Sequence, residues 1–434
     1  MKIAIVTETF FPSTNGVVTR LTQSIRWLTK QGHEVIVIAP DQGVGAYAGA
    51  QIYGIPSFRF FLYPNLPLSL PGRRVGKLLR AFSPDVVHVV NPAMLGAAGV
   101  WFGRRYPLVA SYHTHVPQYA DFYKLPWLKP VLWSYLRLLH NRADLNLCTS
   151  EAVRGELEAR RFRNVRLWKR GVDPELFGPH RRSETMRLRL SGGEPEKRLL
   201  LYVGRLAAEK EIERLRDLLT ASSGFRLAVV GDGPHRAALE AYFAGTGTVF
   251  TGFLHGGGAR GGVCLERRVC VPSATETLGL VLLEAMASGL PVIAAASAPT
   301  REQVAEGTTG FLYEPGAADG LVRAAKPLQD GERLRRMGAA ARAEASGLGW
   351  GRTQPPTAGA LPPSRVGTRT AACRGAKART DQGSRQQNER EHEQPISVPC
   401  NGLRAQQKPA TSRVFVFCPA IDCRFIGTLG LGRI

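Results

Sequence analysis

The sequence has no run of apolar residues that approaches the roughly 18 needed to cross a bilayer, so we predict no transmembrane helix. Acidic residues are also scarce: 35 Asp and Glu stand against 57 Lys and Arg, which gives a formal net charge of +22. Such an excess favours anionic partners, namely membrane lipids, nucleic acids or phosphorylated ligands. The chain opens directly on the apolar pattern Met1–Val6, and we therefore expect no signal or transit peptide.

Cysteine is rare in the part of the chain that has regular hydrophobic patterning, where Cys148 stands alone. The others lie in a glycine-rich patch or in the last 84 residues: Cys264, Cys270, Cys373, Cys400, Cys418 and Cys423. Their spacings match no metal-binding motif, and in a reducing compartment we expect no disulfide framework. The sequence also lacks an Asp-x-Asp pair suited to holding a metal and a diphosphate, so we predict no metal site and no cofactor.

Short apolar segments alternate with longer amphipathic stretches, such as Val17–Gln31 and Pro130–His140. The segments expected to be strands are Lys2–Thr7, Glu34–Ala39, Asp85–Val90, Leu108–Thr114, Leu145–Ser150, Val165–Trp168, Leu199–Gly204, Arg226–Gly231, Thr248–Gly252, Val269–Pro272, Pro291–Ala295 and Thr309–Tyr313. This alternation indicates parallel sheets covered by helices on both faces. The sequence therefore predicts an α/β fold of two doubly wound Rossmann-type domains, residues 1–175 and 176–350, that face each other across a cleft.

The stretch Pro272–Pro291 predicts a loop and then a buried helix, with Thr275 or Thr277 as its N-cap and Gly289 just after its end. Free N–H groups at a helix N-terminus bind anions, so the start of this helix is a candidate site for a phosphorylated ligand. The donor-binding residues predicted there are Thr277, Leu278 and Gly279.

Two carboxylates, Glu276 before this helix and Glu284 within it, sit among apolar residues, where an unpaired charge is costly. Because side chains tilt back towards the helix N-terminus, Glu284 can reach past an anion bound there. A ligand with a central diphosphate and hydroxyl-bearing sugars at both ends, a nucleotide-sugar, fits this layout. The alternative is that Glu276 caps the helix and Glu284 pairs with a buried arginine.

Loops at the predicted carboxyl ends of other strands add further candidate groups. Gly16 opens a helix, and Gly231 and Gly233 lie in a turn, where a ligand can approach the backbone closely. Arg205 and Lys210 place two cations that can neutralise a diphosphate, although surface charge is the alternative interpretation.

Two histidines, His113 and His115, lie at the end of the fourth predicted strand, and a pair at a strand end favours a site over a purely structural role. The candidate catalytic residues are then His113, Arg205, Lys210 and Glu276.

These residues resemble the motifs of the glycogen-synthase-like retaining glycosyltransferases, and the chain is more closely similar to their sulfolipid synthase subfamily. The strings that carry the closer resemblance are Thr7–Pro12, His88–Pro92, Ser111–Tyr119, Asn146–Ser150, Arg170–Phe177 and Val203–Leu206. The resemblance covers about residues 1–350. It implies transfer of sulfoquinovose from UDP-sulfoquinovose to diacylglycerol, by a peripheral enzyme on the cytoplasmic face of an inner or thylakoid membrane. Related mannosyltransferases share much of the pattern, so a GDP-mannose- or UDP-sugar-dependent enzyme with another lipid acceptor is the alternative.

The chain departs from this resemblance in three places. Residues 256–270 are glycine-rich where the family has a helix and a strand, and 297–301 replace a glycine-rich loop. Residues 351–434 have no hydrophobic periodicity, and we interpret both the patch and this tail as products of reading-frame shifts. The alternative for the tail is a genuine disordered extension.

The tail holds 13 Lys and Arg and 5 Asp and Glu, so part of the positive charge belongs to it. In the patterned body, Arg73–Phe82 predicts a basic amphipathic helix, and Lys124–Lys129 begins a second basic and aromatic patch with Trp127, Trp133 and Tyr135. Such segments suit an anionic membrane surface, although packed surface helices are the alternative.

Three classes of function fit these observations to different degrees. We favour the membrane-associated glycosyltransferase, because the cations and carboxylates match a nucleotide-sugar site. A different two-domain enzyme such as a nucleotide-sugar epimerase explains that arrangement less well. A nucleic-acid-binding protein is suggested by charge alone, and the sequence has no aromatic and basic RNA motif, so we expect no nucleic-acid partner.

Overall fold

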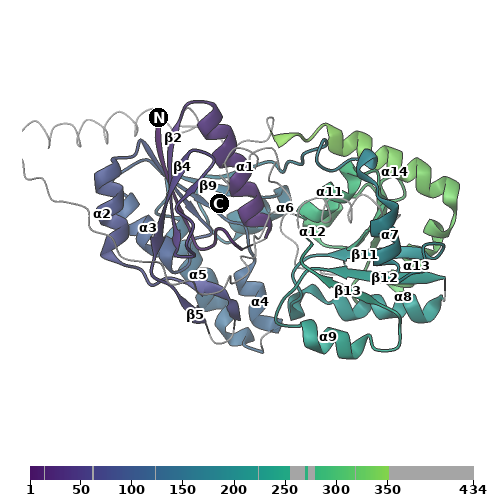
Figure 1. Cartoon of the computed structure of the whole chain (residues 1–434). Helices are drawn as coiled ribbons and strands as arrows, with labels where there is room; N and C mark the ends of the chain where they lie inside the picture. Colours follow the sequence, from purple (N-terminus) through teal and green to yellow (C-terminus); the bar gives the residue numbers. More distant parts are fainter. Residues whose placement is uncertain are drawn as a thin grey trace, which may run out of the picture.

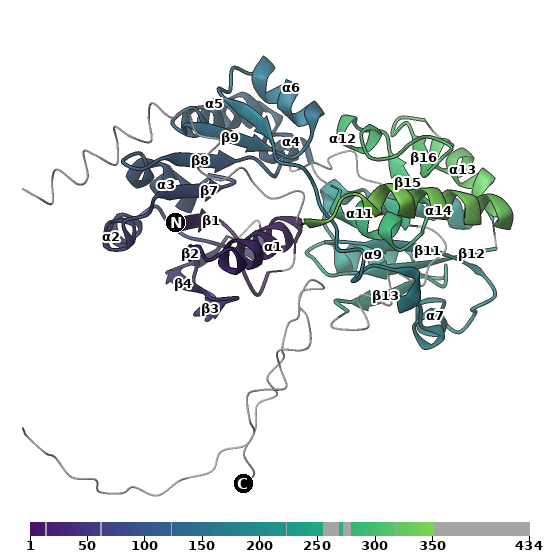
Figure 2. The same cartoon turned by 90° about the horizontal axis from the view of Figure 1, so that it is seen from above.

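The computed structural model describes residues 1–350 with the exception of 14, 61–62, 123, 223, 255–268, 272–278 and 318. These residues form two α/β domains that lie side by side (Figures 1 and 2). The predicted tail 351–434 and nearly all of the glycine-rich patch lie outside the described residues. The doubly wound fold of two Rossmann-type domains is confirmed.

The first domain is built on an eight-stranded sheet with the order β10-β9-β8-β7-β1-β2-β4-β3. Its strands are β1 (Lys2–Thr7), β2 (Glu34–Pro40), β3 (Ala46–Tyr47), β4 (Ala50–Ile55), β7 (Val86–Val90), β8 (Leu108–Ser111), β9 (Leu145–Cys148) and β10 (Val165–Leu167). All neighbouring pairs are parallel except β3 and β4. A separate antiparallel hairpin pairs β5 (Phe58–Phe60) with β6 (Tyr63–Leu68).

The second domain has a six-stranded parallel sheet with the order β13-β12-β11-β14-β15-β16. Its strands are β11 (Arg198–Val203), β12 (Phe225–Val230), β13 (Val249–Gly252), β14 (Val269–Val271), β15 (Val292–Ala295) and β16 (Gly310–Tyr313). All twelve strands expected from the sequence are therefore present, and each observed end lies no more than three residues from the predicted one.

Helices cover both faces of each sheet. Those of the first domain are α1 (Gly16–Lys30), α2 (Arg73–Phe82), α3 (Leu95–Gly103), α4 (Val116–Phe122), α5 (Lys129–His140) and α6 (Glu151–Ala159). Those of the second are α7 (Glu184–Leu190), α8 (Arg216–Ala221), α9 (Arg236–Tyr242), α11 (Leu280–Ala287), α12 (Ala298–Arg301), α13 (Gly320–Ala325) and α14 (Gly331–Ser346). The apolar side of α1 packs on one face of the first sheet, and α2 and α3 pack on the other.

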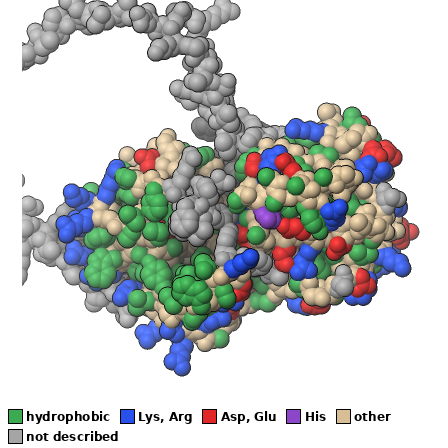
Figure 3. Space-filling view, turned by 90° about the horizontal axis from the view of Figure 1, so that it is seen from below, with side chains coloured by type: hydrophobic (Ala, Val, Ile, Leu, Met, Phe, Trp, Pro, Cys, Tyr) green, Lys and Arg blue, Asp and Glu red, His purple; other side chains and the backbone are tan. Residues whose placement is uncertain are grey.

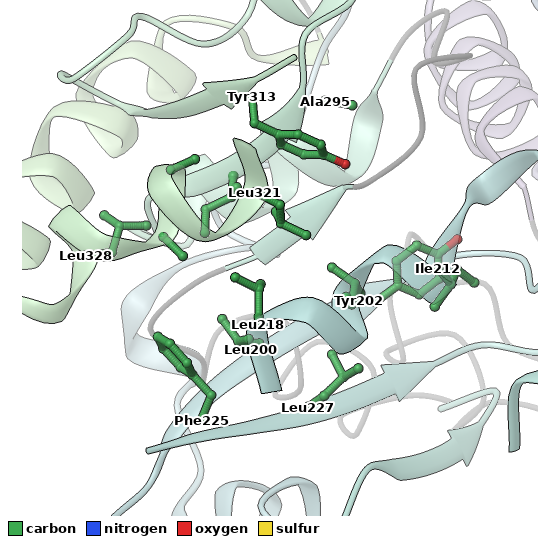
Figure 4. Packing of buried hydrophobic residues seen from close by; sticks show 14 of the residues in the cluster. Leu200, Tyr202, Ile212, Leu218, Phe225, Leu227, Ala295, Tyr313, Leu321 and Leu328 are labelled. Atoms are coloured by element: carbon green, nitrogen blue, oxygen red, sulfur yellow. The ribbon is translucent and has the colours of Figure 1, made fainter. Parts of the chain in front are cut away.

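The second sheet likewise separates two hydrophobic cores. On one face, Leu200, Tyr202 and Leu227 from the strands meet Leu218 of α8 and Leu321 of α13 (Figure 4). On the other face, α11 packs between the sheet and α14. Because α11 is covered on both sides, its apolar residues are nearly all buried, as the sequence predicted.

The chain crosses between the domains after β10. The guanidinium of Arg20 in α1 donates to the carbonyl oxygens of Trp168 and Lys169 at the start of the crossing. The backbone of Val172 then pairs with Leu348 and Gly349, where the chain returns after α14. The crossing predicted around residues 169–179 is thus found, tied to both domains.

Two local predictions are wrong. The buried helix α11 begins at Leu280, with Gly279 as its N-cap, whereas the sequence predicted a start at Thr275 or Thr277, two residues that lie outside the described part of the chain. Trp133, expected at an exposed basic patch, is buried and stacks against Tyr112 at a centroid distance of 6.1 Å. Helical spacing explains this, because the buried residues of α5 recur every three to four positions.

Candidate active site

Loops at the carboxyl ends of both sheets meet between the domains. Gly16, which follows β1, lies against α11 of the second domain: a Cβ at Gly16 would be 3.6 Å from Leu280 Cδ1. The short 3₁₀ helix η3 (Ala208–Lys210), which follows β11, contacts α4 of the first domain. Ligands of doubly wound sheets bind at such carboxyl ends, so this junction is the candidate site.

Two helix N-termini converge at the junction. Asn15 caps α1, since its Oδ1 accepts hydrogen bonds of 3.0 Å from the N–H groups of Val17 and Val18. The opposing helix α11 starts after Gly279, and no side chain caps it among the described residues. Helix N-termini carry partial positive charge, so two that face each other favour an anion between them.

Gly279 owes its identity to two constraints. Its φ of 59° lies in the left-handed region, and an added Cβ would fall 2.8 Å from Nε2 of Gln303. Glycine therefore lets the chain turn sharply into α11 and, having no side chain, cannot itself cap the first-turn N–H groups.

Glu284 lies in the second turn of α11 and is partly buried. Burial raises the pKa of its carboxyl to about 8, and no hydrogen bond or ion pair is formed by this carboxyl with the residues that the structure describes. The alternative interpretation, an ion pair with a buried arginine, is therefore not supported within this part of the chain. A buried carboxyl group in such surroundings is suited to form hydrogen bonds with a ligand.

The two predicted cations lie together on the loop that follows β11. Arg205 forms an ion pair with Glu209, whose side chain is completely buried. The backbone of Arg205 is held too, because the hydroxyl of Tyr202 donates to its carbonyl oxygen at 2.9 Å. Lys210 ends η3, the turn that contacts α4 of the first domain. Both cations are thus placed on the side of the second domain that faces the first.

The predicted glycines Gly231 and Gly233 serve a contact between two backbones. A Cβ at Gly231 would lie 1.9 Å from the carbonyl oxygen of Gly204, and one at Gly233 would lie 2.1 Å from that of Leu206. Larger residues would push this turn away from the loop that carries Arg205. The close packing of the two loops is therefore a sufficient reason for both glycines.

His113 follows β8 and is almost completely buried. Its Nε2 and the Nε2 of His88 both lie 2.9 Å from the hydroxyl of Ser111, which joins the two rings. Burial, followed by the nearby charge of Arg20, holds the pKa of His113 well below its usual range, and burial lowers that of His88 to about 4. Both rings are neutral at neutral pH, so His113 offers a neutral hydrogen-bonding group.

Glu276, Thr277 and Leu278, which were also predicted as site residues, lie outside the described residues. Within the described part of the chain, no cluster of three His, Cys, Asp or Glu side chains is placed to bind a metal ion. In that same part, every helix is too short or too polar to cross a membrane.

The sequence matches known families over both domains. The profile described as Glycosyltransferase Family 4 matches residues 14–176, and that described as Glycosyl transferases group 1 matches residues 188–344. The chain is 40% identical over 351 residues to sulfoquinovosyl transferase SQD2 of Arabidopsis thaliana, covering 78% of this chain and 69% of that one. The chain belongs to glycosyltransferase family 4. It is a retaining glycosyltransferase of the hexosyltransferase type, with a nucleotide-sugar as donor.

Other relatives of this glycosyltransferase are nearly as similar. A GDP-mannose-dependent alpha-mannosyltransferase of Mycobacterium tuberculosis (strain CDC 1551 / Oshkosh) is 38% identical over 325 residues, covering 73% of this chain and 84% of that one. The fold is that of sucrose-phosphate synthase from Thermosynechococcus elongatus, with a TM-score of 0.67 at 19% identity, covering 87% of this chain and 99% of that one.

Sequence reasoning missed two buried charges of this glycosyltransferase that shape the site. Glu8, directly after β1, accepts hydrogen bonds from the N–H groups of Ala93, Leu95 and Gly96 at 2.9, 3.1 and 2.7 Å and so fixes the start of α3. The sequence feature that could have revealed it is a carboxylate directly after a strand whose centre, Ile3–Val6, is entirely apolar.

Arg20 is completely buried in α1, and its guanidinium stacks on Trp168 at 4.0 Å. The sequence feature that could have revealed it is a charged residue on the apolar side of the helix α1.

Proposed function

We propose that this glycosyltransferase transfers sulfoquinovose from UDP-sulfoquinovose to diacylglycerol at a membrane surface. The observation that carries the proposal is the 40% identity over 351 residues with a sulfoquinovosyl transferase, spread across both domains. The geometry is consistent with it, because helix N-termini, two cations and a carboxyl group of the second domain all lie near the junction between the domains.

In this proposal the diphosphate lies between Gly16 and the start of α11, where two helix N-termini converge. Glu284 accepts hydrogen bonds from the ribose hydroxyls. Hydrogen bonds to the charged form lower a carboxyl pKa, so the donor would reverse the rise that burial causes in the empty site. Gly231 and Gly233 keep the neighbouring loops close enough to border the nucleotide.

The reaction places its largest charge change on the diphosphate. The bond between the anomeric carbon and the diphosphate oxygen breaks, and the acceptor oxygen bonds to the same carbon. The proton of the acceptor hydroxyl passes to an oxygen of the departing diphosphate. Arg205 and Lys210 then stabilise negative charge that grows in the transition state, which lowers the barrier more than it tightens ground-state binding. His113 supplies a neutral hydrogen-bonding group beside the sugar, with Glu276 as the further catalytic carboxylate.

The second candidate is a GDP-mannose-dependent transfer to another lipid acceptor. It rests on a specific observation, the 38% and 37% identities with mannosyltransferases described as GDP-mannose-dependent. The residues named above can serve either donor, because the diphosphate and the ribose are common to both.

Thermal unfolding in the presence of each donor separates the two candidates. A ligand that binds the native state alone stabilises it by about 2.7 kcal/mol at a hundred times its Kd. At equal concentrations, UDP-sulfoquinovose should raise the melting temperature more than GDP-mannose does. A larger shift with GDP-mannose would overturn the sulfolipid assignment in favour of the second candidate.

A further inference from the structure

An apolar groove lies on the outer face of the first domain, between α2, α3 and α5. Its volume is about 360 Å³, within the range of small-molecule sites, and its lining includes Ala97, Trp101 and Leu138. Two arginines, Arg73 at the start of α2 and Arg142 after α5, also line it. None of the lining residues is a donor-site residue, so the groove is separate from the site between the domains.

The sequence builds this groove with small residues in two helices. A Cβ at Gly76 of α2 would lie 2.7 Å from the ring of Phe102, so glycine lets α2 pack directly on α3. The first half of α3 is Leu-Gly-Ala-Ala-Gly, whose alanines Ala97 and Ala98 leave room that larger side chains would fill. Trp101 and Leu138 line the space that remains.

The segment of the chain that builds the groove, residues 70–142, is rich in exposed apolar and basic side chains. Residues 70–142 contain ten Lys and Arg but two Asp and Glu. The large apolar side chains exposed in the same segment are Leu70, Trp101, Trp127, Val131, Tyr135 and Leu138, with exposed fractions from 40% to 69%. Figure 3 shows hydrophobic side chains gathered over the first domain, at left, while charges of both signs mix over the second.

This combination points to one kind of partner. Exposed aromatic and aliphatic side chains flanked by arginine are typical of surfaces that lie in the interface of a bilayer. Trp101 shows the pairing directly, since the guanidinium of Arg104 lies 4.1 Å from its ring centroid. A nucleic acid would use the charge but leave the apolar groove unfilled, and a neutral hydrophobic partner would leave the arginines unused.

We propose that the groove binds the acyl chain of an anionic phospholipid, with the lipid phosphate held by Arg73 and Arg142. The guanidinium fork suits a phosphate, and each basic residue near an anionic bilayer contributes about 1 kcal/mol. The bound lipid docks the first domain on the membrane. This extends the proposed function, because the diacylglycerol acceptor lies in the same membrane, yet it requires no particular donor sugar.

Co-sedimentation of the full chain with vesicles tests this site. The chain should bind vesicles that contain phosphatidylglycerol and not vesicles of phosphatidylcholine alone, with binding that weakens as salt rises. The double variant Arg73→Gln/Arg142→Gln should bind about fivefold more weakly per arginine, which corresponds to about 1 kcal/mol each. Its matched control is Arg335→Gln/Arg336→Gln, which removes two exposed charges from α14 of the second domain.

A second pair of variants tests the apolar part of the groove. Leu138→Ser should weaken vesicle binding, whereas Leu188→Ser, at a similarly exposed position of the second domain, should not. With phosphatidylglycerol carrying brominated acyl chains, Trp101→Phe should remove more of the tryptophan quenching than Trp27→Phe, because α1 covers the opposite face of the sheet.

Equal losses in the groove variants and their controls would overturn the proposal, as would vesicle binding that none of them changes. A dimer that Leu138→Ser dissociates in the absence of vesicles would instead assign the groove to contact between two copies of the chain. Melting-temperature shifts with UDP-sulfoquinovose, measured on the same variants, keep the two proposals apart. If UDP-sulfoquinovose does not raise the melting temperature while vesicle binding still depends on the groove, the donor assignment alone is wrong.

Discussion

On the first-domain side of the site the buried side chains of Glu8 and His113 are already hydrogen-bonded, whereas the second-domain side carries a carboxyl group that bonds to none of the described residues. Glu8 is bound by three backbone N–H groups, and His113 is joined through Ser111 to a second histidine. Glu284 of α11 has no such partners among the described residues, and burial raises its pKa to about 8. The first domain therefore contributes side chains whose hydrogen bonds are formed within the protein. The second contributes a carboxyl group, that of Glu284, which we expect to form its hydrogen bonds with the ligand.

The comparison implies different consequences of mutation on the two sides. Changes to the first-domain groups should lower stability, because buried bonds are lost. Changes to the second-domain groups should lower turnover or donor affinity at little cost in stability.

Lys210→Ala should have the largest effect. It removes a cation from the place where negative charge develops, and losing one such group typically costs about a hundredfold to a thousandfold in kcat. Donor KM should change far less, and the melting temperature should stay the same. Steady-state kinetics check this in a chain whose residues 256–270 have been rebuilt to the helix and strand of the family. Lys326→Ala, an exposed lysine of the same domain, is the control. Near-normal turnover in Lys210→Ala would rule out the mechanism in which this lysine assists departure of the diphosphate.

Glu8→Gln should lower the free energy of unfolding by about 2 kcal/mol, because the amide group opposes one of the three N–H donors at the start of α3. Urea unfolding measures the effect. The exposed substitution Glu196→Gln is the control and should be silent. An unchanged midpoint in Glu8→Gln would mean that the first-domain side is less tightly built than its hydrogen bonds indicate.

His88→Gln should change how stability depends on pH. The pKa of His88 is lowered to about 4 from its usual 6.5, so the unfolded chain binds the proton more readily between these values. Stability is therefore lost as pH falls from 6.5 towards 4. Glutamine can keep a hydrogen bond to Ser111 without titrating, so the variant should match the wild type at pH 7.5 and exceed it at pH 5. The control His180→Gln replaces an exposed ring, and parallel pH profiles in wild type and His88→Gln would contradict the expectation.

Much of the fold was predictable because its signals are local. A strand such as Lys2–Thr7 is a short apolar run, and α2 was predicted with its observed ends, Arg73 and Phe82, from its amphipathic pattern. The hairpin of β5 and β6 was missed because Pro64 and Pro67 interrupt its second strand, and proline usually excludes a strand. Strand β4 was missed because Gly54 lies within it, and glycine is depleted in strands.

The site was less predictable because its interactions span the chain. Glu8 bonds to residues 85 to 88 positions away, a distance over which sequence spacing carries no information. The start of α11 was misplaced because two threonines are good caps, whereas the observed turn depends on how Gln303 packs against Gly279. Tertiary packing decided both cases.

Glu284→Gln should have the smallest effect and separates the two sides most sharply. The pKa of this carboxyl rises from about 4.5 to about 8, so between these values the folded chain holds a proton that the unfolded chain has lost. Stability is therefore lost as pH rises through this window, the opposite of the slope that His88 produces. Glutamine removes the titration and keeps the shape. Because the residue is partly exposed and solvent screens it, the gain at pH 8 should be on the order of 1 kcal/mol, with none near pH 4.5.

The same Glu284→Gln variant should bind the donor less well, since a neutral amide accepts weaker hydrogen bonds from ribose hydroxyls than a carboxylate does. Donor KM should rise while kcat changes little, as expected for a contact that is equally strong in ground and transition states. Urea unfolding at pH 5 and pH 8, and donor-induced melting shifts, measure the two effects. A variant that is more stable at pH 8 yet binds the donor normally would show that the cost of burying Glu284 does not serve ligand binding. The contrast between a bonded first-domain side and a ligand-completed second-domain side would then fail.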